Sequence, residues 1–182
     1  MHKYRNFSIL DPILANRKDI SFLCAVEKSW IIREAKRDDC DAIYDLICEL
    51  AAFERAEDEV DITPADLAED IFGPRSILEV LLLEFDSEIV GAAMIYEKYS
   101  TWKGRAVHLE DLIVKEAHRG KGYGAALFEA VIELAKKREY SRMDWQVLDW
   151  NESAIGFYKK YGALFLDEWV DCRFTTDELN KL

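Results

Sequence analysis

The amino-acid sequence predicts one domain of α/β class, with a mixed central β-sheet flanked by helices. Its 182 residues are half apolar and one third charged, a composition typical of a globular chain that can bury a core without disulfides or metal. Two β-rich runs are separated by a polar two-residue turn, which indicates a hairpin. Further along, a strand, a glycine-rich loop, a long amphipathic helix and another strand follow in order, which favours a parallel crossover in the same sheet.

We divide the chain into an N-terminal extension over residues 1–28 and a folded domain over residues 29–182. The extension mixes basic and acidic residues and lacks the apolar core and cleavage site of a secretory signal. A transit peptide, a partner-binding arm and an upstream start are all compatible with it. The folded domain opens with Trp30–Arg33, which we expect to be the first strand.

Two helices are predicted after this strand. The first is capped by Asp38 or Asp39, and its apolar side chains recur at helical spacing at Ile43, Leu46, Ile47, Leu50 and Phe53. The second begins at Thr63-Pro64, an N-cap followed by proline at the first helical position, and stops at Gly73-Pro74.

The rest of the chain predicts mainly strands. The runs over 77–85 and 88–99 flank the turn Asp86-Ser87, and the run over 106–114 leads into the glycine loop. A long helix follows the loop, then a strand over 143–148 and a helix that is capped by Asn151 and ends at Gly162. We expect Leu164–Phe165 and Trp169–Phe174 to form the last strands.

Charge restricts the class of partner. The chain has 24 basic and 36 acidic side chains, a net charge of −12, which argues against nucleic-acid binding and favours a cationic partner. Residues 38–88 hold 17 acidic and 2 basic side chains, whereas residues 115–142 hold 7 basic and 4 acidic ones. An anionic ligand is therefore expected near the glycine loop and a cationic ligand near the acidic half. No apolar run approaches the roughly 18 residues of a membrane span.

The cysteines indicate a reducing compartment. Cys24, Cys40, Cys48 and Cys172 form no CxxC pair and have no nearby histidine pair, so we expect free thiols, no metal site and a cytoplasmic protein.

The glycine-rich segment is the clearest candidate binding site. Arg119-Gly120-Lys121-Gly122-Tyr123-Gly124 lies between a strand and a helix N-terminus, where free backbone N–H groups and the helix dipole favour phosphate oxygens. The segment lacks the GK[ST] ending of a P-loop and the third glycine of a dinucleotide fingerprint. A purely structural turn is the alternative to a site for another phosphate-bearing ligand.

This segment fits the R/Q-x-x-G-x-G/A signature and resembles the GNAT superfamily of N-acetyltransferases. Further blocks resemble the diamine acetyltransferases, and most of all their thialysine-acetylating branch; the resemblance covers about residues 29–174. These blocks are Ile32-Arg33-Glu34-Ala35, Glu49-Leu50-Ala51-Ala52-Phe53-Glu54, Tyr99-Ser100-Thr101-Trp102-Lys103-Gly104-Arg105, Leu109-Glu110-Asp111 and Val147-Leu148-Asp149-Trp150-Asn151.

The resemblance implies a splayed sheet in which acetyl-CoA lies where two parallel strands part. The backbone of Leu112, Ile113 and Val114 would pair with the pantetheine arm. The loop would hold the pyrophosphate, and the start of a later helix would lie along the arm. The implied cofactor-binding residues beyond that strand are Arg119, Gly120, Lys121, Gly122, Tyr123, Gly124, Ala125, Asn151, Glu152, Ser153, Ala154 and Tyr158.

The resemblance also implies two catalytic residues. Glu110 would accept the proton of the attacking amine, directly or through water, and Tyr158 would donate to the leaving thiolate. Because adjacent residues of a strand face opposite ways, we expect only one of Glu110 and Asp111 to point at the ligand. No cysteine stands at a matched catalytic position, so we expect direct transfer in a ternary complex.

The implied substrate is a small di- or polycationic amine, a thialysine-like lysine analogue, a diamine or a polyamine. Its implied contacts are Phe53, Glu54, Glu110, Asp111, Asp144, Trp145 and Gln146. A homodimer is also expected from the resemblance. Two alternatives stay open: a protein acetyltransferase acting on lysine or N-terminal amines, and a non-catalytic CoA-binding protein.

Overall fold

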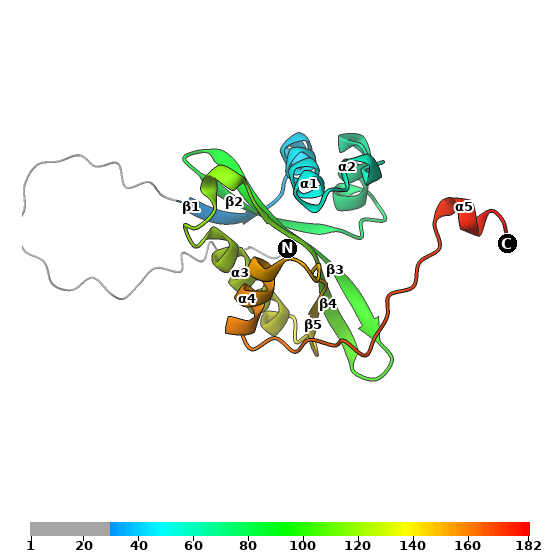
Figure 1. Ribbon diagram of the computed structural model, residues 1–182. Helices are drawn as coiled ribbons and strands as arrows, with labels where there is room; N and C mark the ends of the chain where they lie inside the picture. The colour runs from blue at the N-terminus through cyan, green and yellow to red at the C-terminus, as the bar shows by residue number, and fades with distance from the viewer. Residues whose placement is uncertain (1–29) are drawn as a thin grey trace, which may run out of the picture.

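A five-stranded sheet forms the centre of the computed structural model, which describes residues 30–182; the predicted extension over 1–28 lies outside the described residues. The strand order is β1-β2-β3-β4-β5 (Figure 1). Neighbouring strands are antiparallel from β1 to β4, and β5 runs parallel to β4, so the predicted mixed sheet is confirmed. The strands are β1 (Trp30–Glu34), β2 (Glu79–Phe85), β3 (Glu88–Ser100), β4 (Gly104–Val114) and β5 (Met143–Trp145).

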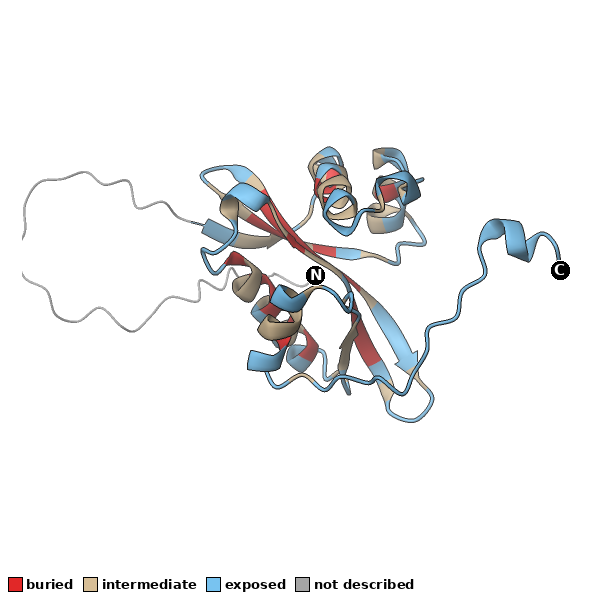
Figure 2. Ribbon diagram, viewed as in Figure 1, coloured by how far each residue is buried: buried red, intermediate tan, exposed pale blue. Residues whose placement is uncertain are grey.

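Helices cover both faces of this sheet (Figure 1). One face carries α1 (Cys40–Glu54) and α2 (Pro64–Phe72), and the other carries α3 (Tyr123–Lys137) and α4 (Glu152–Lys160). Buried side chains concentrate along the middle of the sheet and the inner faces of the helices (Figure 2). The short elements are the 3₁₀ turns η1 (Arg37–Asp39), η2 (Glu57–Glu59) and η3 (Glu116–His118), and the helix α5 (Thr176–Leu179). Within residues 30–182, no helix is long and apolar enough to cross a membrane.

Two of the predicted helix starts, those of α2 and α4, are confirmed by their caps, whereas Asp39 precedes α1 without a side-chain bond to it. The backbone N–H of Asp66 donates to the Thr63 hydroxyl at 3.3 Å, and the Thr63 N–H donates to the Asp66 carboxylate at 2.9 Å, which closes a capping box ahead of Pro64. At α4, the Ala154 N–H donates to the Asn151 side-chain oxygen at 3.1 Å. These contacts satisfy backbone donors that a helix N-terminus leaves unpaired.

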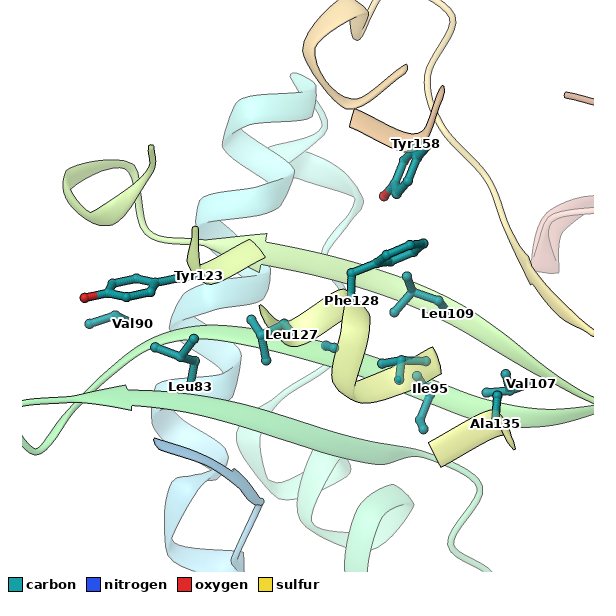
Figure 3. Close-up of a cluster of buried hydrophobic side chains, with 12 residues drawn as sticks. Leu83, Val90, Ile95, Val107, Leu109, Tyr123, Leu127, Phe128, Ala135 and Tyr158 are labelled. Atoms are coloured by element: carbon teal, nitrogen blue, oxygen red, sulfur yellow. The ribbon is translucent and has the colours of Figure 1, made fainter. Parts of the chain in front are cut away.

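The hydrophobic core between the sheet and α3 supports the strands that carry the site. Leu127 and Phe128 are fully buried against the strands (Figure 3), as is Val131 one turn further along α3. Burial of an apolar side chain of this size contributes roughly 1.5–3 kcal/mol to the stability of the fold. Gly91 on β3 allows β4 to lie close beside it, because a Cβ at Gly91 would lie only 2.8 Å from the Ile113 carbonyl oxygen.

A β-bulge interrupts β4 at Glu110. Met94 pairs with Asp111 and the next residue, Ile95, pairs with Leu109, so Glu110 is an extra residue without a partner in β3. The bulge changes which residues share a face: Leu109 packs in the core under α3, whereas Ile113, two residues beyond Asp111, packs under α1. The strict alternation expected for Glu110 and Asp111 therefore does not hold.

The parallel strands β4 and β5 part early. They pair only over Val107–Leu109 and Met143–Trp145, so β5 is shorter than the predicted strand over 143–148. Beyond Leu109, the edge of β4 that faces β5 has no pairing strand among the described residues. The splayed sheet implied by the resemblance is thereby confirmed.

The two predicted C-terminal strands are wrong. Residues 163–175 contain no regular element, and the chain ends at α5, well away from the sheet (Figure 1). A strand needs a neighbour for its backbone hydrogen bonds, and no strand of the described chain pairs with these residues. Their apolar side chains are therefore exposed: Leu164 is 88% and Val170 is 83% accessible.

Candidate active site

The glycine loop forms an anion-binding helix start. Gly120 and Gly122 have positive φ angles of 76° and 85°, and α3 begins directly after Gly122. The first backbone hydrogen bond of α3 is donated by the Ala126 N–H to the Gly122 carbonyl. In the described chain, the backbone N–H groups just before Ala126 are therefore free to bind a ligand. A Cβ at either glycine would meet nothing within 4 Å, so glycine is required for the backbone conformation rather than for space. This geometry fits a pyrophosphate.

Arg119 ties the loop to β4 and α1. Its Nε donates to the Val114 carbonyl at 2.9 Å, and its guanidinium carbon lies 5.1 Å from the centroid of the Phe53 ring. Glu49 on α1 supports the same turn, because its carboxylate accepts the Glu116 N–H at 2.8 Å. The expected cofactor loop and the expected substrate residue Phe53 therefore lie side by side.

The implied pantetheine strand is available. Leu112, Ile113 and Val114 pair with β3 on one side, and in the described chain no strand pairs with their other edge, although the Val114 carbonyl accepts from Arg119 Nε. The start of α4 supplies Asn151, Glu152, Ser153 and Ala154, after Trp150, whose ring centroid lies 5.7 Å from that of Phe53.

Tyr158 sits two turns into α4 and projects toward the sheet with its hydroxyl foremost (Figure 3). Its ring packs against Trp145 at 5.0 Å and Phe128 at 5.4 Å between centroids. Burial raises the pKa of Tyr158 to about 12, so the phenol holds its proton at neutral pH. Trp145, expected near the substrate, also packs in this aromatic cluster.

Three carboxylates gather where β4 and β5 part. Asp111 is partly buried, and its pKa is raised to about 6 by that burial first and then by the charges of Glu110 and Glu54. Burial also raises the pKa of Glu54, the last residue of α1. Within residues 30–182, neither Asp111 nor Glu54 has a salt-bridge partner, whereas the Glu110 carboxylate lies 3.5 Å from the His108 Nε2. We call Glu54, Glu110 and Asp111 the carboxylate group.

Asp144 and Gln146 do not join the carboxylate group. The Asp144 carboxylate lies 3.0 Å from Arg142 Nε and 3.4 Å from Lys98 Nζ, so its charge is already balanced. The Gln146 amide donates to Asp171 in the segment after α4.

Sequence reasoning missed His108 as a neighbour of the site. It is 9% exposed, its ring centroid lies 4.9 Å from that of Tyr96, and it faces Glu110. The available signal was its position two residues before Glu110 on the same strand. The described cysteines Cys40, Cys48 and Cys172 are free, as expected, and Cys24 lies outside the described residues.

A splayed mixed sheet, a glycine-rich helix start at the parted strands and a buried phenol opposite define the class of acyl-CoA-dependent acyltransferases. The model of the acetyltransferase (GNAT) family matches residues 32–163, and the chain belongs to that family. It is an acetyltransferase, and the family implies acetyl-CoA as the acyl donor.

Relatives and solved structures agree with this assignment. The Bos taurus thialysine N-epsilon-acetyltransferase is 39% identical over 163 residues, 84% of this chain and 96% of its own length. The Homo sapiens spermidine/spermine N(1)-acetyltransferase-like protein 1 is 35% identical over 158 residues, 81% of this chain and 23% of its own length. The solved structure of a V. cholerae integron cassette protein superposes with a TM-score of 0.70 at 25% identity, covering 84% of this chain and 96% of that one.

Proposed function

We propose that this acetyltransferase acetylates a primary amine of a small substrate that carries at least one further positive charge, such as thialysine, a diamine or a polyamine. The carboxylate group is the observation that carries the proposal. Asp111 is ionised above about pH 6, although it is buried and, in the described chain, unpaired. A buried charge without a partner is costly, and a bound ammonium group would relieve that cost.

The position of Glu54 favours a substrate with two cationic ends. Glu54 ends α1 beside Phe53, and its charge is close enough to raise the pKa of Asp111. One ammonium would lie at Glu54 while the reacting amine lies at Glu110 and Asp111. Each charge-assisted hydrogen bond of this kind contributes roughly 1.5–3 kcal/mol.

The residues around the parted strands fit acetyl-CoA. The free edge of β4 over Leu112–Val114 would take the pantetheine arm, and the loop from Gly120 to Ala125 would take the pyrophosphate. Asn151 and the residues after it would lie along the arm. When bound there, acetyl-CoA supplies the acetyl group as a thioester.

One residue would accept the proton of the attacking amine, and a second would donate a hydrogen bond to the leaving sulfur. The Glu110 carboxylate, on the bulge, accepts the proton that the attacking nitrogen loses, directly or through water. As the carbon–sulfur bond breaks, the Tyr158 hydroxyl donates a hydrogen bond to the negative charge on the leaving sulfur. Its raised pKa keeps the donor protonated at the pH of the reaction. No covalent enzyme intermediate is required.

We rank thialysine or a similar lysine analogue slightly ahead of spermidine. The Phe53-Glu54 pair and the block around Trp102 support this order, as does the similarity to the bovine thialysine N-epsilon-acetyltransferase. A lysine analogue also carries a carboxylate. The Arg105 guanidinium is already paired with Glu97 at 2.8 Å, so another cation would have to contact that carboxylate.

A side-by-side kcat/KM measurement tests the proposal. The panel contains thialysine, lysine, a short diamine, spermidine and a lysine-containing peptide. We expect one of the small dications to lead. A peptide that wins by more than tenfold would replace this proposal with a protein acetyltransferase, and binding of CoA without turnover of any amine would indicate a non-catalytic protein.

We further propose a homodimer that uses the segment after α4. In that segment Leu164, Trp169, Val170 and Phe174 are each more than half exposed, a surface that a second copy could bury. Light scattering should give twice the chain mass, and a chain truncated after Gly162 should run as a monomer. A monomeric full-length protein at micromolar concentration contradicts this.

A further inference from the structure

His108 occupies a buried position beside the proposed catalytic carboxylate. It lies on β4, two residues before Glu110, and pairs across the sheet with Tyr96 on β3 and Asp144 on β5. Only 9% of its surface is exposed. A titratable ring so deeply buried, next to a group that must change its protonation state, requires a physical explanation.

The two ring nitrogens have different surroundings. Nε2 lies 3.5 Å from a Glu110 carboxylate oxygen, whereas the buried Nδ1 has no hydrogen-bond partner in the described chain. A neutral imidazole carries one N–H, and an unpaired buried donor facing no acceptor is unfavourable. The proton is therefore expected on Nε2, the nitrogen that lies near the carboxylate.

We propose that His108 is a positioning residue that holds the Glu110 carboxylate toward the reacting amine by donating from Nε2; the inference rests on the acetyltransfer proposed above. Glu110 sits on a bulge and is more than half exposed at its side chain, so its own strand does not fix its rotamer. The His108 ring is itself fixed, because it is buried and stacks on Tyr96 at 4.9 Å.

A neutral donor suits an amine-binding site. A lysine or arginine in this position would hold the carboxylate equally well but would repel the cationic substrate. Burial lowers the pKa of His108, which outweighs the opposing effect of nearby carboxylates. The charged and titratable groups that face it are Glu110 on β4, Lys98 and Tyr96 on β3, Asp144 on β5 and Asp171 after α4. At neutral pH the imidazole therefore orients Glu110 without adding a charge.

Paired substitutions separate positioning from packing. His108→Phe keeps a ring against Tyr96 but removes the donor, whereas His108→Gln offers an N–H near the place of Nε2. Val107→Ala serves as the control, because Val107 is the buried neighbour on the opposite face, in the core under α3. Each variant is assayed for kcat and KM with thialysine and spermidine across pH, for CoA affinity, and for its melting temperature.

We expect His108→Phe to lower kcat about ten- to a hundredfold, the size of one hydrogen bond to a charged group, with CoA affinity unchanged. KM for either amine should change much less than kcat, because the lost contact orients the proton acceptor. His108→Gln should recover most of the activity. Val107→Ala should lower the melting temperature and leave kcat close to that of the wild type. Equal losses in the Phe and Gln variants, or no loss in either, would overturn the proposal.

A second measurement does not depend on turnover. Nitrogen-15 spectra of the wild-type histidines should show His108 as the neutral Nε2–H tautomer at pH 7 to 8. The Nδ1–H tautomer refutes the positioning contact. If these spectra agree with the proposal while no amine is acetylated, the proposed function has failed and the contact has not.

Discussion

Asp111→Asn is expected to stabilise the fold while it impairs the enzyme. The substitution keeps the size and shape of a buried side chain and removes its charge. In the wild type that charge has no cationic partner within residues 30–182, and it lies near the charges of Glu110 and Glu54. The amide avoids both the desolvation and the repulsion.

The size of this stabilisation follows from the pKa of Asp111. Asp111 titrates at about 6 in the fold, against 3.8 for an ordinary aspartate, and each pKa unit corresponds to about 1.36 kcal/mol. For an acid with a raised pKa, the stability present below pH 4 is lost as the pH rises through 6. Above pH 7 the wild type is thus about 3 kcal/mol less stable than a form with a neutral side chain at this position.

Thermal unfolding from pH 4 to pH 8 checks this. The two proteins should melt close together at pH 4, and Asp111→Asn should melt higher by roughly 6–12 °C at pH 8. Asp45→Asn, on the exposed face of α1, is the matched control. Its melting temperature should differ from that of the wild type by the same small amount at every pH. KM for a diamine should rise in Asp111→Asn because the buried anion is lost. A variant that melts below the wild type at pH 8 would show that the Asp111 charge stabilises the fold, and the reasoning would be refuted.

Three further changes test the remaining residues. Tyr158→Phe should reduce kcat by roughly 10² to 10⁴ with CoA affinity nearly intact, and an unchanged kcat at saturation would leave the hydroxyl without a chemical role. Gly122→Val places a branched side chain at φ 85°, so CoA should no longer raise the melting temperature; a normal response would put the cofactor elsewhere. Glu54→Gln should raise KM for diamines or thialysine about ten- to a hundredfold and affect a monoamine less; equal effects on both would remove Glu54 from the second ammonium.

Local chemistry made much of the fold predictable. The capping residues Thr63 and Asn151 and the glycines around Lys121 each determine backbone conformation through their own side chain or its absence. These signals lie within a few residues of the structure they specify, so the helices and the loop could be located from sequence.

The remaining features depend on partners that lie far away in the sequence. Residues 164–174 have the apolar content of strands but no neighbouring strand in the described chain, and sequence does not show whether a partner is present. The placement of Trp145 in the core, beside Phe128 and Tyr158, likewise depends on packing between elements far apart in sequence. The role of His108 required knowing what surrounds its ring.

The bulge at Glu110 explains how two adjacent carboxylates acquire different environments. In a regular strand Glu110 and Asp111 would face opposite sides of the sheet, and one of them would enter the core under α3, where no cation could reach it. The extra residue instead lets Asp111 turn under α1, near Glu54, while Glu110 stays accessible beside His108. Burial then holds the Asp111 pKa far above its ordinary value, whereas Glu110 keeps contact with solvent and with a hydrogen-bond donor. Neighbouring acids whose surroundings differ in this way can divide the work of binding one ammonium and accepting the proton of another.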